Sequence, residues 1–287
     1  MEQRFVLELE GQLAGRMFSV HGGQVTSEVM GEPLSSSVNR VKSTGQIDFE
    51  PLVMYFGTGM SQIFYKWINS GVARTDVRRN GSVIQLDNHS RMVHRRAFYH
   101  ALVKDVVFPD LNKSSTKEAM VRVVVQPEWT ITSTEVPKHL GVYASSLPKA
   151  WSVNHFRMEI DGLSMDSHHI SKIEGLSLRQ SIKKFHTTKQ KFPEIDLGRQ
   201  EFANITIEVP MANAKEFLLW QGSDLRQHSL GAKVGRIRFI APGSRSAFFT
   251  LTLYDLDIVS ISKAPAAYWI ELTFRSMSME AGASAMK

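Results

Sequence analysis

Two Ser-x-x-Lys pairs are the side chains whose spacing could support covalent catalysis. Ser114 stands three residues before Lys117, and Ser260 stands three residues before Lys263. In one class of serine acyl-transferases, a lysine at this spacing activates the serine hydroxyl as a nucleophile. The partner motifs of that class are missing from the sequence. We therefore interpret both pairs as turn residues that follow a strand, and we keep a serine hydrolase as the last of three hypotheses.

The ten histidines do not form a pattern that would hold a metal ion. His168 and His169 are adjacent, so on a strand their rings would point to opposite faces of the sheet. The chain contains no cysteine, which excludes disulfides, thiolate nucleophiles and thiolate metal ligands. Residues 57–59 and 231–235 carry glycines but do not fit the spacing of a phosphate-binding loop. The sequence predicts no catalytic residues, no cofactor and no metal site.

The composition is typical of a globular protein with one large domain or two ordinary ones, since 43% of its 287 residues are hydrophobic and 22% are charged. No run of about 18 apolar residues occurs, so we expect no membrane-spanning helix, and the first residues, Met-Glu-Gln-Arg-Phe, have no apolar stretch typical of a secretory signal. The net charge is +6, and basic residues are scattered except for dense spots at 78–79 and 91–96. We interpret these spots as solvated strand ends. The alternative is a β-barrel that binds nucleic acid without sequence preference.

Alternating apolar and polar residues predict strands through most of the chain. Asn80-Gly81 predicts a tight turn, because both residue types tolerate positive φ. Helices are expected near residues 61–70 and 212–221, where large apolar side chains cluster. The predicted fold class is mainly β with one helix per module, built as two tandem modules of the β-sandwich or β-barrel type. The clearest strand patterns cover residues 5–10, 83–86, 120–125, 205–209, 236–240, 248–254 and 269–274.

Similar segments recur about 150 residues apart, which indicates an internal repeat. Phe5 and Gly11 match Phe156 and Gly162 at a spacing of 151 residues. A repeat of this length is typical of duplicated domains. Further matches pair Ala97 with Ala247, Phe98 with Phe248, Asp105 with Asp255, and residues 47–51 with residues 205–210.

The repeat divides the chain into two modules. We predict a first module over residues 1–130, a linker rich in proline, glycine and serine over 131–153, and a second module over 154–287. Between the early strands of each module lies a long irregular stretch, residues 22–46 in the first and about 175–200 in the second. We expect each stretch to be an interaction arm or a flexible loop.

One run of motifs carries a family resemblance. Residues 78–87 read Arg-Arg-Asn-Gly-Ser-Val-Ile-Gln-Leu-Asp, and Arg-Ala-Phe-Tyr-His-Ala at 96–101 and Pro-Asp-Leu-Asn-Lys-Ser-Ser at 109–115 follow. This order resembles the contractile-phage tail tube family, which includes the T4-like tail tube and the inner tube of phage tail-like injection systems. The opening Phe-x-x-x-Ile/Leu-x-Gly strand of both modules is similar to the family's start. The second module lacks the Arg-Arg-Asn-Gly-Ser and Pro-Asp-Leu-Asn motifs, so the chain resembles a tandem, diverged form of a family whose members are usually single modules.

The resemblance implies a structural role in a virion tail. Members of this family form hexameric rings whose strands join around a channel that DNA or an effector passes through. If both modules line the channel, three chains supply six modules, as in a tube initiator or a baseplate hub; if only one does, six chains form the ring. The implied partners are further copies of the chain, the tail sheath and baseplate or hub proteins. Copies of the chain would meet within a ring and between stacked rings, and the long arm between the early strands would contact neighbouring rings. Synthesis in the host cytoplasm and no membrane insertion are also expected.

The same resemblance marks polar residues of the first module as candidate channel or inter-subunit contacts. They share the motifs described above or the neighbouring basic spots. The set comprises Arg78, Arg79, Asn80, Arg95, Arg96, Asp110 and Asn112.

Overall fold

The computed structural model describes residues 4–33, 40–57, 59–75, 77–87, 89, 91–134, 151–163, 169–186, 192–227, 233–240 and 247–282. Several of the expectations above lie outside the described residues, in whole or in part. They concern residues 34–39 and 187–191 of the two arms, 135–150 of the linker, His168, and 231–232 of the second glycine-containing segment.

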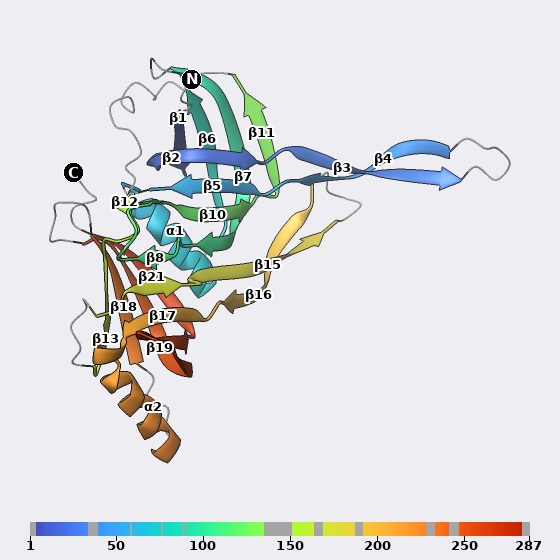
Figure 1. Cartoon of the computed structure of the whole chain (residues 1–287). Helices are drawn as coiled ribbons and strands as arrows, with labels where there is room; N and C mark the ends of the chain where they lie inside the picture. The colour runs from blue at the N-terminus through green and yellow to red at the C-terminus, as the bar shows by residue number, and fades with distance from the viewer. Residues whose placement is uncertain are drawn as a thin grey trace.

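Strands dominate both halves of the chain (Figure 1), so the predicted mainly-β fold class is confirmed. Within the described residues each module carries one α-helix, α1 (Gln62–Ala73) in the first and α2 (Lys215–Gln227) in the second, preceded by the 3-10 turn η2 (Met211–Asn213). Both helices end later than the sequence predicted. In α1, Phe64, Trp67 and Ile68 follow the three- and four-residue spacing of one helical face, and all three are buried.

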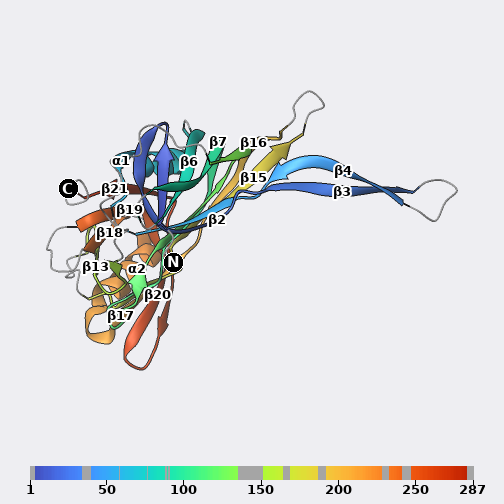
Figure 2. The same cartoon turned by 90° about the horizontal axis from the view of Figure 1, so that it is seen from above.

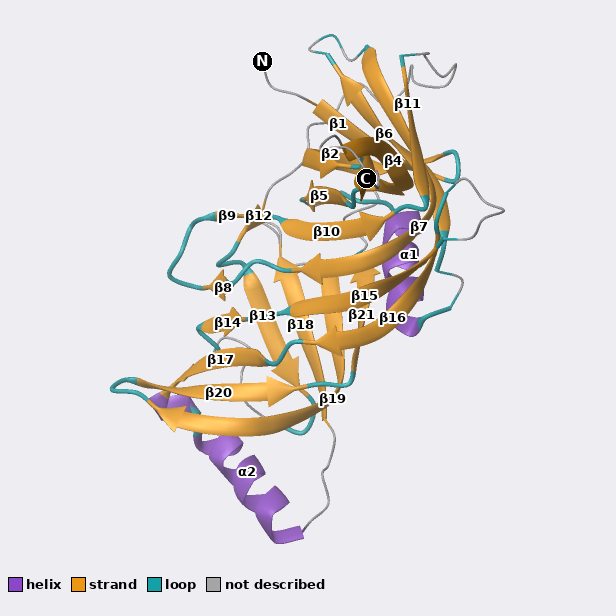
Figure 3. Cartoon of the chain, turned by 90° about the vertical axis from the view of Figure 1, so that its right-hand side faces the viewer, coloured by secondary structure: helices purple, strands orange, loops and turns teal. Residues whose placement is uncertain are grey.

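A closed antiparallel barrel forms the first module (Figure 3). The sheet closes because β10 pairs with both β5 and β7. Helix α1 packs against this barrel, and the Trp67 ring stacks on the Phe98 ring with centroids 6.2 Å apart. A further strand, β11 (Trp129–Ser133), pairs with β7. Around the barrel the order is β10 (Val121–Gln126), β5 (Leu52–Phe56), β2 (Gln12–Gly22), β1 (Arg4–Leu9), β6 (Arg79–Leu86) and β7 (Met92–Val107).

The second module repeats this strand order around its own long strand, β19 (Ala247–Lys263). A strand of the first module, β8 (Leu111–Asn112), ends the second sheet, so the two modules share it. The strand β21 (Ser276–Ala281) pairs with β19 as β11 pairs with β7. From one end to the other the sheet reads β13 (Phe156–Ile160), β18 (Lys233–Ile240), β19, β20 (Ala267–Thr273), β17 (Ile205–Pro210), β14 (Lys172–Glu174) and β8.

Each module also carries a long hairpin at the place where the sequence predicted an arm. In the first module the hairpin is β3 (Val25–Pro33) with β4 (Arg40–Phe49), and it projects away from both modules (Figures 1 and 2). In the second module β15 (Ser177–Phe185) pairs with β16 (Glu194–Phe202) and also with β7 of the first barrel. The equivalent hairpins therefore have different surroundings. A small sheet of β9 (Glu118–Ala119) and β12 (Trp151–Ser152) also crosses between the modules.

Strand registers establish which residues of the two modules are equivalent. Leu9 pairs with Gly81 as Ile160 pairs with Gly235, which confirms the predicted match of Phe5 with Phe156. Gly11 and Gly162 also match, since both turn with positive φ, 75° and 79°. In the helices, Phe64 and Trp67 occupy the third and sixth positions of α1, as Phe217 and Trp220 do in α2.

The later matches proposed at a spacing of 150 residues were wrong. His100 and Asp255 are equivalent, because each is a non-glycine residue with positive φ at the same point of the long strand, 48° and 56°. Phe98 therefore corresponds to Leu253, which pairs with Gly235 as Phe98 pairs with Gly81. By the same spacing of 155 residues, Ala97 corresponds to Thr252, and Asp105 to Ser260.

The match of residues 47–51 with 205–210 was also displaced, because β5 and not β4 is equivalent to β17. Longer connections in the second module increase the spacing from 151 residues at β1 to 155 at β7, which a fixed offset cannot follow. Side chains alternate between the two faces of a strand, so an alignment that is wrong by an odd number of residues assigns each side chain to the opposite face of the sheet.

The predicted linker is partly strand. Its first residues belong to the end of β11, and its last residues form β12. The module boundaries stay a prediction.

Asn80-Gly81 does not form the predicted tight turn. Both residues lie inside β6, and neither has positive φ. Glycine is required for a different reason: a Cβ atom at Gly81 would lie 2.4 Å from the carbonyl oxygen of Glu8 and 2.5 Å from the Phe98 ring. The missing side chain therefore lets β6 pack between β1 and the aromatic core.

Candidate assembly interface

The long strand β7 brings the two modules together. The first part of β7 pairs with β6, and this pairing ends opposite Ala101. The last residues of β7 pair along the same edge with β15 of the second module. The register places Leu178 opposite Val106, and Leu178 is 0% exposed. Next to it, the buried side chain of Gln180 donates from Nε2 to the carbonyl oxygen of Val103 at 2.9 Å. Strand addition thus covers an edge that would otherwise expose unpaired backbone groups.

The Pro-Asp-Leu-Asn segment forms a second part of the join. Leu111 of β8 pairs with Ile173 of β14, and Asp110 Oδ1 accepts a hydrogen bond from the Gly175 amide at 3.3 Å. The Asn112 side chain stabilises the turn by accepting from the Ser114 amide at 2.9 Å and from its hydroxyl at 2.7 Å. Asp110 and Asn112, both expected to make channel or inter-subunit contacts, lie where the modules of one chain meet.

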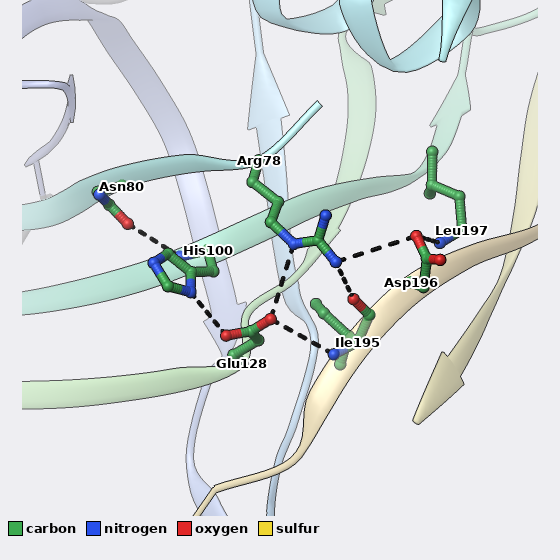
Figure 4. Close-up of polar contacts among 7 residues, drawn as sticks. All are labelled: Arg78, Asn80, His100, Glu128, Ile195, Asp196 and Leu197. Atoms are coloured by element: carbon green, nitrogen blue, oxygen red, sulfur yellow. Dashed lines mark hydrogen bonds and ion pairs between the residues drawn. The ribbon is translucent and has the colours of Figure 1, made fainter. Parts of the chain in front are cut away.

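The Glu128 carboxylate is the centre of a polar cluster at this join (Figure 4). Its side chain is 8% exposed and lies 3.7 Å from Arg78 Nε and 2.7 Å from His100 Nδ1. It also accepts from the Ile195 amide of β16 at 3.4 Å, while Arg78 Nη2 donates to the Ile195 carbonyl at 2.5 Å. A charged pair of the first module therefore satisfies both backbone groups of Ile195 on the outer edge of β16.

Neighbouring side chains of the first module form further hydrogen bonds with the outer edge of β16. Arg74 Nη2 donates to the carbonyl oxygen of Leu197 at 2.9 Å. Beneath the polar contacts, Ile195 and Leu197 pack on Leu102 of β7 in a small buried apolar cluster. Gln200 Nε2 reaches the end of α1 and donates to the Val72 carbonyl at 3.0 Å. The hairpin β15–β16 is thus held by its strand edge, by an apolar face and by side-chain caps.

Helix α1 completes the interface by contacting β21. The Asn69 amide acts like a backbone peptide: Nδ2 donates to the Met279 carbonyl at 2.7 Å, and Oδ1 accepts from the Met279 amide at 2.8 Å. One turn earlier, the Tyr65 ring stacks on Phe249 with centroids 5.5 Å apart. The helix therefore covers part of the edge of β21, in the way that edge strands are protected elsewhere.

Replacing Asn69 with alanine is expected to lower the free energy of unfolding by about 2 kcal/mol, because both backbone groups of Met279 lose their partner. Urea unfolding followed by fluorescence measures this loss, and amide exchange at Met279 should accelerate. Asn204→Ala is the control, since it removes an exposed amide that bonds Glu271 at 2.8 Å. An effect of equal size in both variants would contradict the assigned role of Asn69.

Burial raises the pKa of the Tyr65 phenol above its ordinary value. The folded chain thus favours the neutral phenol. The contribution of this group to the free energy of unfolding is fully present below pH about 10 and is lost as the pH rises above that value. We expect the free energy of unfolding to fall by up to about 1.4 kcal/mol per pH unit from this one group. Tyr65→Phe should make the alkaline decline less steep, whereas Tyr254→Phe, at an exposed site, should not. Identical alkaline profiles for the wild type and Tyr65→Phe would refute this assignment.

The remaining candidate contacts lie within the first module. Arg95 Nη2 is 3.4 Å from Glu8 Oε1, and the Arg96 guanidinium donates to the Gly22 carbonyl. Arg79 lies at the start of β6, where Nη1 donates to the Arg78 carbonyl at 2.8 Å. Asn80 connects the turn after β1 to β7, because its amide donates to Glu10 at 2.7 Å and its Oδ1 accepts from the His100 amide at 2.9 Å. A role for these four residues in a channel or between subunits stays a prediction.

Sequence reasoning missed the residues that bind the modules to each other most directly. Asn69, Glu128, Leu178 and Gln180 belong to no motif, and each acts on a backbone group or side chain far away in the chain. The available signal was the repeat itself. Once the strands are correctly aligned, residues buried at the module join have exposed equivalents in the other module, as Leu178 has in Val25 and Tyr65 has in Leu218.

The two Ser-x-x-Lys pairs have unlike surroundings. Ser114 lies in a turn, as predicted, and its hydroxyl donates to Asn112. Ser260 does not follow a strand, because Ser260 and Lys263 both lie within β19; the Ser260 hydroxyl bonds Glu271 Oε2 at 3.2 Å. The described residues contain no cluster of three or more histidine or carboxylate side chains fit for a metal ion. Nor does the described part of the chain include a helix long and apolar enough to cross a membrane.

Comparison with known proteins gives one family match. Residues 2–128 match the family described as T4-like virus tail tube protein gp19. No curated protein matches the chain.

Similar solved structures come from contractile injection systems. One is a chain of the sheath-tube complex of the extracellular contractile injection system PVC in its extended state, with 16% identity and a TM-score of 0.41, covering 46% of this chain and 89% of that one. Another, from the anti-feeding prophage tube-terminating cap, has 15% identity, a TM-score of 0.41 and the same coverage. A third, from the anti-feeding prophage baseplate, has 16% identity and a TM-score of 0.38, covering 46% and 92%.

Proposed function

Residues 2–128 match the T4-like virus tail tube family, and we propose from this match that the chain is a structural subunit of an inner tail tube. The tube is that of a contractile phage tail or a phage-like injection system. Copies of the chain assemble into stacked rings around a channel for DNA or an effector. The role is mechanical: the chain forms a wall and catalyses no reaction.

The continuity of sheets between the modules carries this proposal. Strand β15 extends the sheet of the first barrel at β7, and β8 extends the sheet of the second module at β14 (Figure 3). A module that joins its neighbour by strand addition is suited to a ring, because every edge finds a partner when the ring closes. The proposed partners are further copies of the chain, the tail sheath and baseplate or hub proteins. The proposed location is the virion tail, after synthesis in the host cytoplasm.

A tube initiator or baseplate hub built from three chains is the second candidate. In such a ring both modules of each chain line the channel, so that three chains supply six modules. The side-by-side joining of the modules through β7 and β15 favours this arrangement over one in which the second module only decorates the ring. Under this alternative the chain occupies one ring next to the baseplate, whereas a tube subunit recurs along the tail.

Non-specific binding of nucleic acid by the barrel is the third candidate, and the contacts of the arginines weaken it. Arg78 and Arg95 lie next to the carboxylates of Glu128 and Glu8, which offset part of their positive charge. Binding to DNA that falls steeply with salt, and that is reduced by neutralising these arginines, would support this candidate.

Electron microscopy of the purified protein, with sedimentation to count the chains, tests the proposed function. We expect rings or short stacks with a central channel, formed at high concentration or beside a partner tube. A protein that stays monomeric under both conditions would refute the structural role. Particles that contain three chains in one ring would favour the initiator or hub position over the repeating tube.

A further inference from the structure

We propose that the projecting hairpin β3–β4 of one copy of the chain adds to a free edge of β19 in a second copy. Thr26 then lies opposite Ser260, and Val25 lies opposite Ile261. This proposal rests on the proposed function, since it names the surface through which the chains of a ring are joined. Its basis is the equivalence between two hairpins: β15 of one pairs with β7 of the same chain, whereas β3 and β4 of the other pair only with each other among the described residues.

The base of each hairpin has the same geometry. Gly22 turns with φ of 82°, and a Cβ atom there would contact the carbonyl oxygen of Pro51. Gly175 turns with φ of 84°, and a Cβ atom there would lie 2.9 Å from the carbonyl oxygen of Asn204. Both hairpins therefore leave their module in the same way, with the same close approach of two backbones.

The hairpin registers are also the same. Val25 pairs with Phe49 as Leu178 pairs with Phe202, and each hairpin has an irregularity two residues further on. Val25 is thus the equivalent of Leu178. Leu178 is 0% exposed against β7, whereas Val25 is 60% exposed. An apolar side chain that is buried at one module join is left uncovered at the other end of the chain.

The edge that would accept β3 is present on the second module. Residues 257–263 of β19 pair with β20 along one edge, and β18 ends its pairing with β19 opposite Leu256. Among the residues that the structure describes, no strand pairs with the other edge of 257–263. In the first module β15 occupies this same edge of β7, just beyond the end of β6.

Exposed apolar side chains accompany this free edge. Val259 is 48% exposed in the middle of it. On the nearby helix α2, Leu218 is exposed at the position where α1 has Tyr65, which is buried against Phe249 of the neighbouring module. The second module thus covers the edge of β7 and Tyr65 on the first module. The equivalent edge of β19 and the equivalent residue Leu218 on the second module are left uncovered. Because the described residues of each chain provide one projecting hairpin and one accepting edge, the contact is head-to-tail and can close into a ring.

Disulfide formation between engineered cysteines tests this register, and the absence of native cysteine keeps the readout free of background. The variant is Thr26→Cys with Ser260→Cys, at exposed sites whose equivalents, Arg179 and Asp105, pair across β15 and β7. Paired residues of an antiparallel sheet lie about 4.5–5.5 Å apart at Cα, which is within disulfide reach. Oxidation should therefore link chains covalently, and the largest closed product on a denaturing gel counts the chains in a ring.

Two controls fix the interpretation. Arg179→Cys with Asp105→Cys should give a disulfide within one chain, which shows that the oxidation works at a known pair. Thr26→Cys with Lys263→Cys moves the acceptor three residues along β19, roughly 10 Å, and should give no linkage. Mixing the Thr26→Cys and Ser260→Cys single variants should give covalent dimers that neither variant forms alone.

The outcomes separate this inference from the proposed function. Linkage at Thr26 and Ser260, without linkage in the Lys263 control, supports the inference. If sedimentation finds oligomers but these cysteines do not link, or if Thr26→Cys alone forms dimers, the inference is wrong and the proposed function stands. A chain that is monomeric at every concentration and never links refutes both.

Discussion

Leu178→Asp is expected to lower the free energy of unfolding by about 4 kcal/mol, from lost apolar burial and from a carboxylate forced into an apolar site. Leu178 is fully buried where β15 joins β7, opposite Val106. Leu178 belongs to the apolar core, so the new charge would separate the strands or become protonated. Chemical denaturation measures the loss. Amide exchange in β15 and β16 should rise before exchange in the first barrel.

Val25→Asp is the matched control, since it places the same charge at the equivalent position of the other hairpin. Because Val25 is exposed in the isolated chain, the change in stability should stay within about 0.5 kcal/mol. The same variant should abolish ring formation, because Val25 becomes buried when chains join. Equal destabilisation by both variants would show that Val25 is already covered in the single chain. Unimpaired ring formation by Val25→Asp would count against the proposed contact.

Glu128→Ala is expected to lower the free energy of unfolding by about 3 kcal/mol, because it breaks an ion pair whose carboxylate is buried. This value is at the lower end of the range for such pairs, since the partners Arg78 and His100 are half-exposed. The variant leaves the Ile195 amide without its acceptor, and it leaves the Arg78 guanidinium with only the exposed Asp196 carboxylate, 3.9 Å away. Glu128→Gln keeps one accepting oxygen and should lose only about 1 kcal/mol. Thermal and denaturant unfolding of the three proteins provide the comparison.

The repeat supplies the control for Glu128 as well. Arg275 is equivalent to it, because Arg275 donates its amide to the Tyr254 carbonyl as Glu128 donates to that of Tyr99. Arg275 forms an ion pair with Asp255 at 3.5 Å, but its side chain is 84% exposed. Arg275→Ala should therefore change the stability by less than about 0.5 kcal/mol. A large loss in Arg275→Ala, or none in Glu128→Ala, would contradict the view that burial at the module join makes this position important.

Part of the fold could be predicted because it depends on local patterns. Phe5 and Phe156 were matched correctly because the opening strand and its glycine turn have the same length in both modules. The matches at β7 and β19 failed because the connections before these strands differ in length. Asn80-Gly81 was misread as a turn because the need for glycine arises from the Glu8 backbone and the Phe98 ring, which lie elsewhere in the sequence.

The candidate site shows the same division. Asp110 and Asn112 were found through a motif, and both lie at the module join. Arg78 was also predicted, but its partners, Glu128 and the Ile195 backbone, were not. Backbone groups on a strand edge are the same for every residue type, so a sequence does not mark which side chain will cap them.

From the amino-acid order alone follow the β-rich character, the duplication, one helix per module and the family resemblance of the first module. These features rest on apolar periodicity and motifs, which neighbouring residues specify. The three-dimensional arrangement decided the rest: that β15 docks on β7, that Glu128 and Asn69 cap strand edges, and that β3–β4 and the edge of β19 stay uncovered. Strand edges pair through space, between residues many positions apart, so equivalent sequences acquire different partners only when the chain folds.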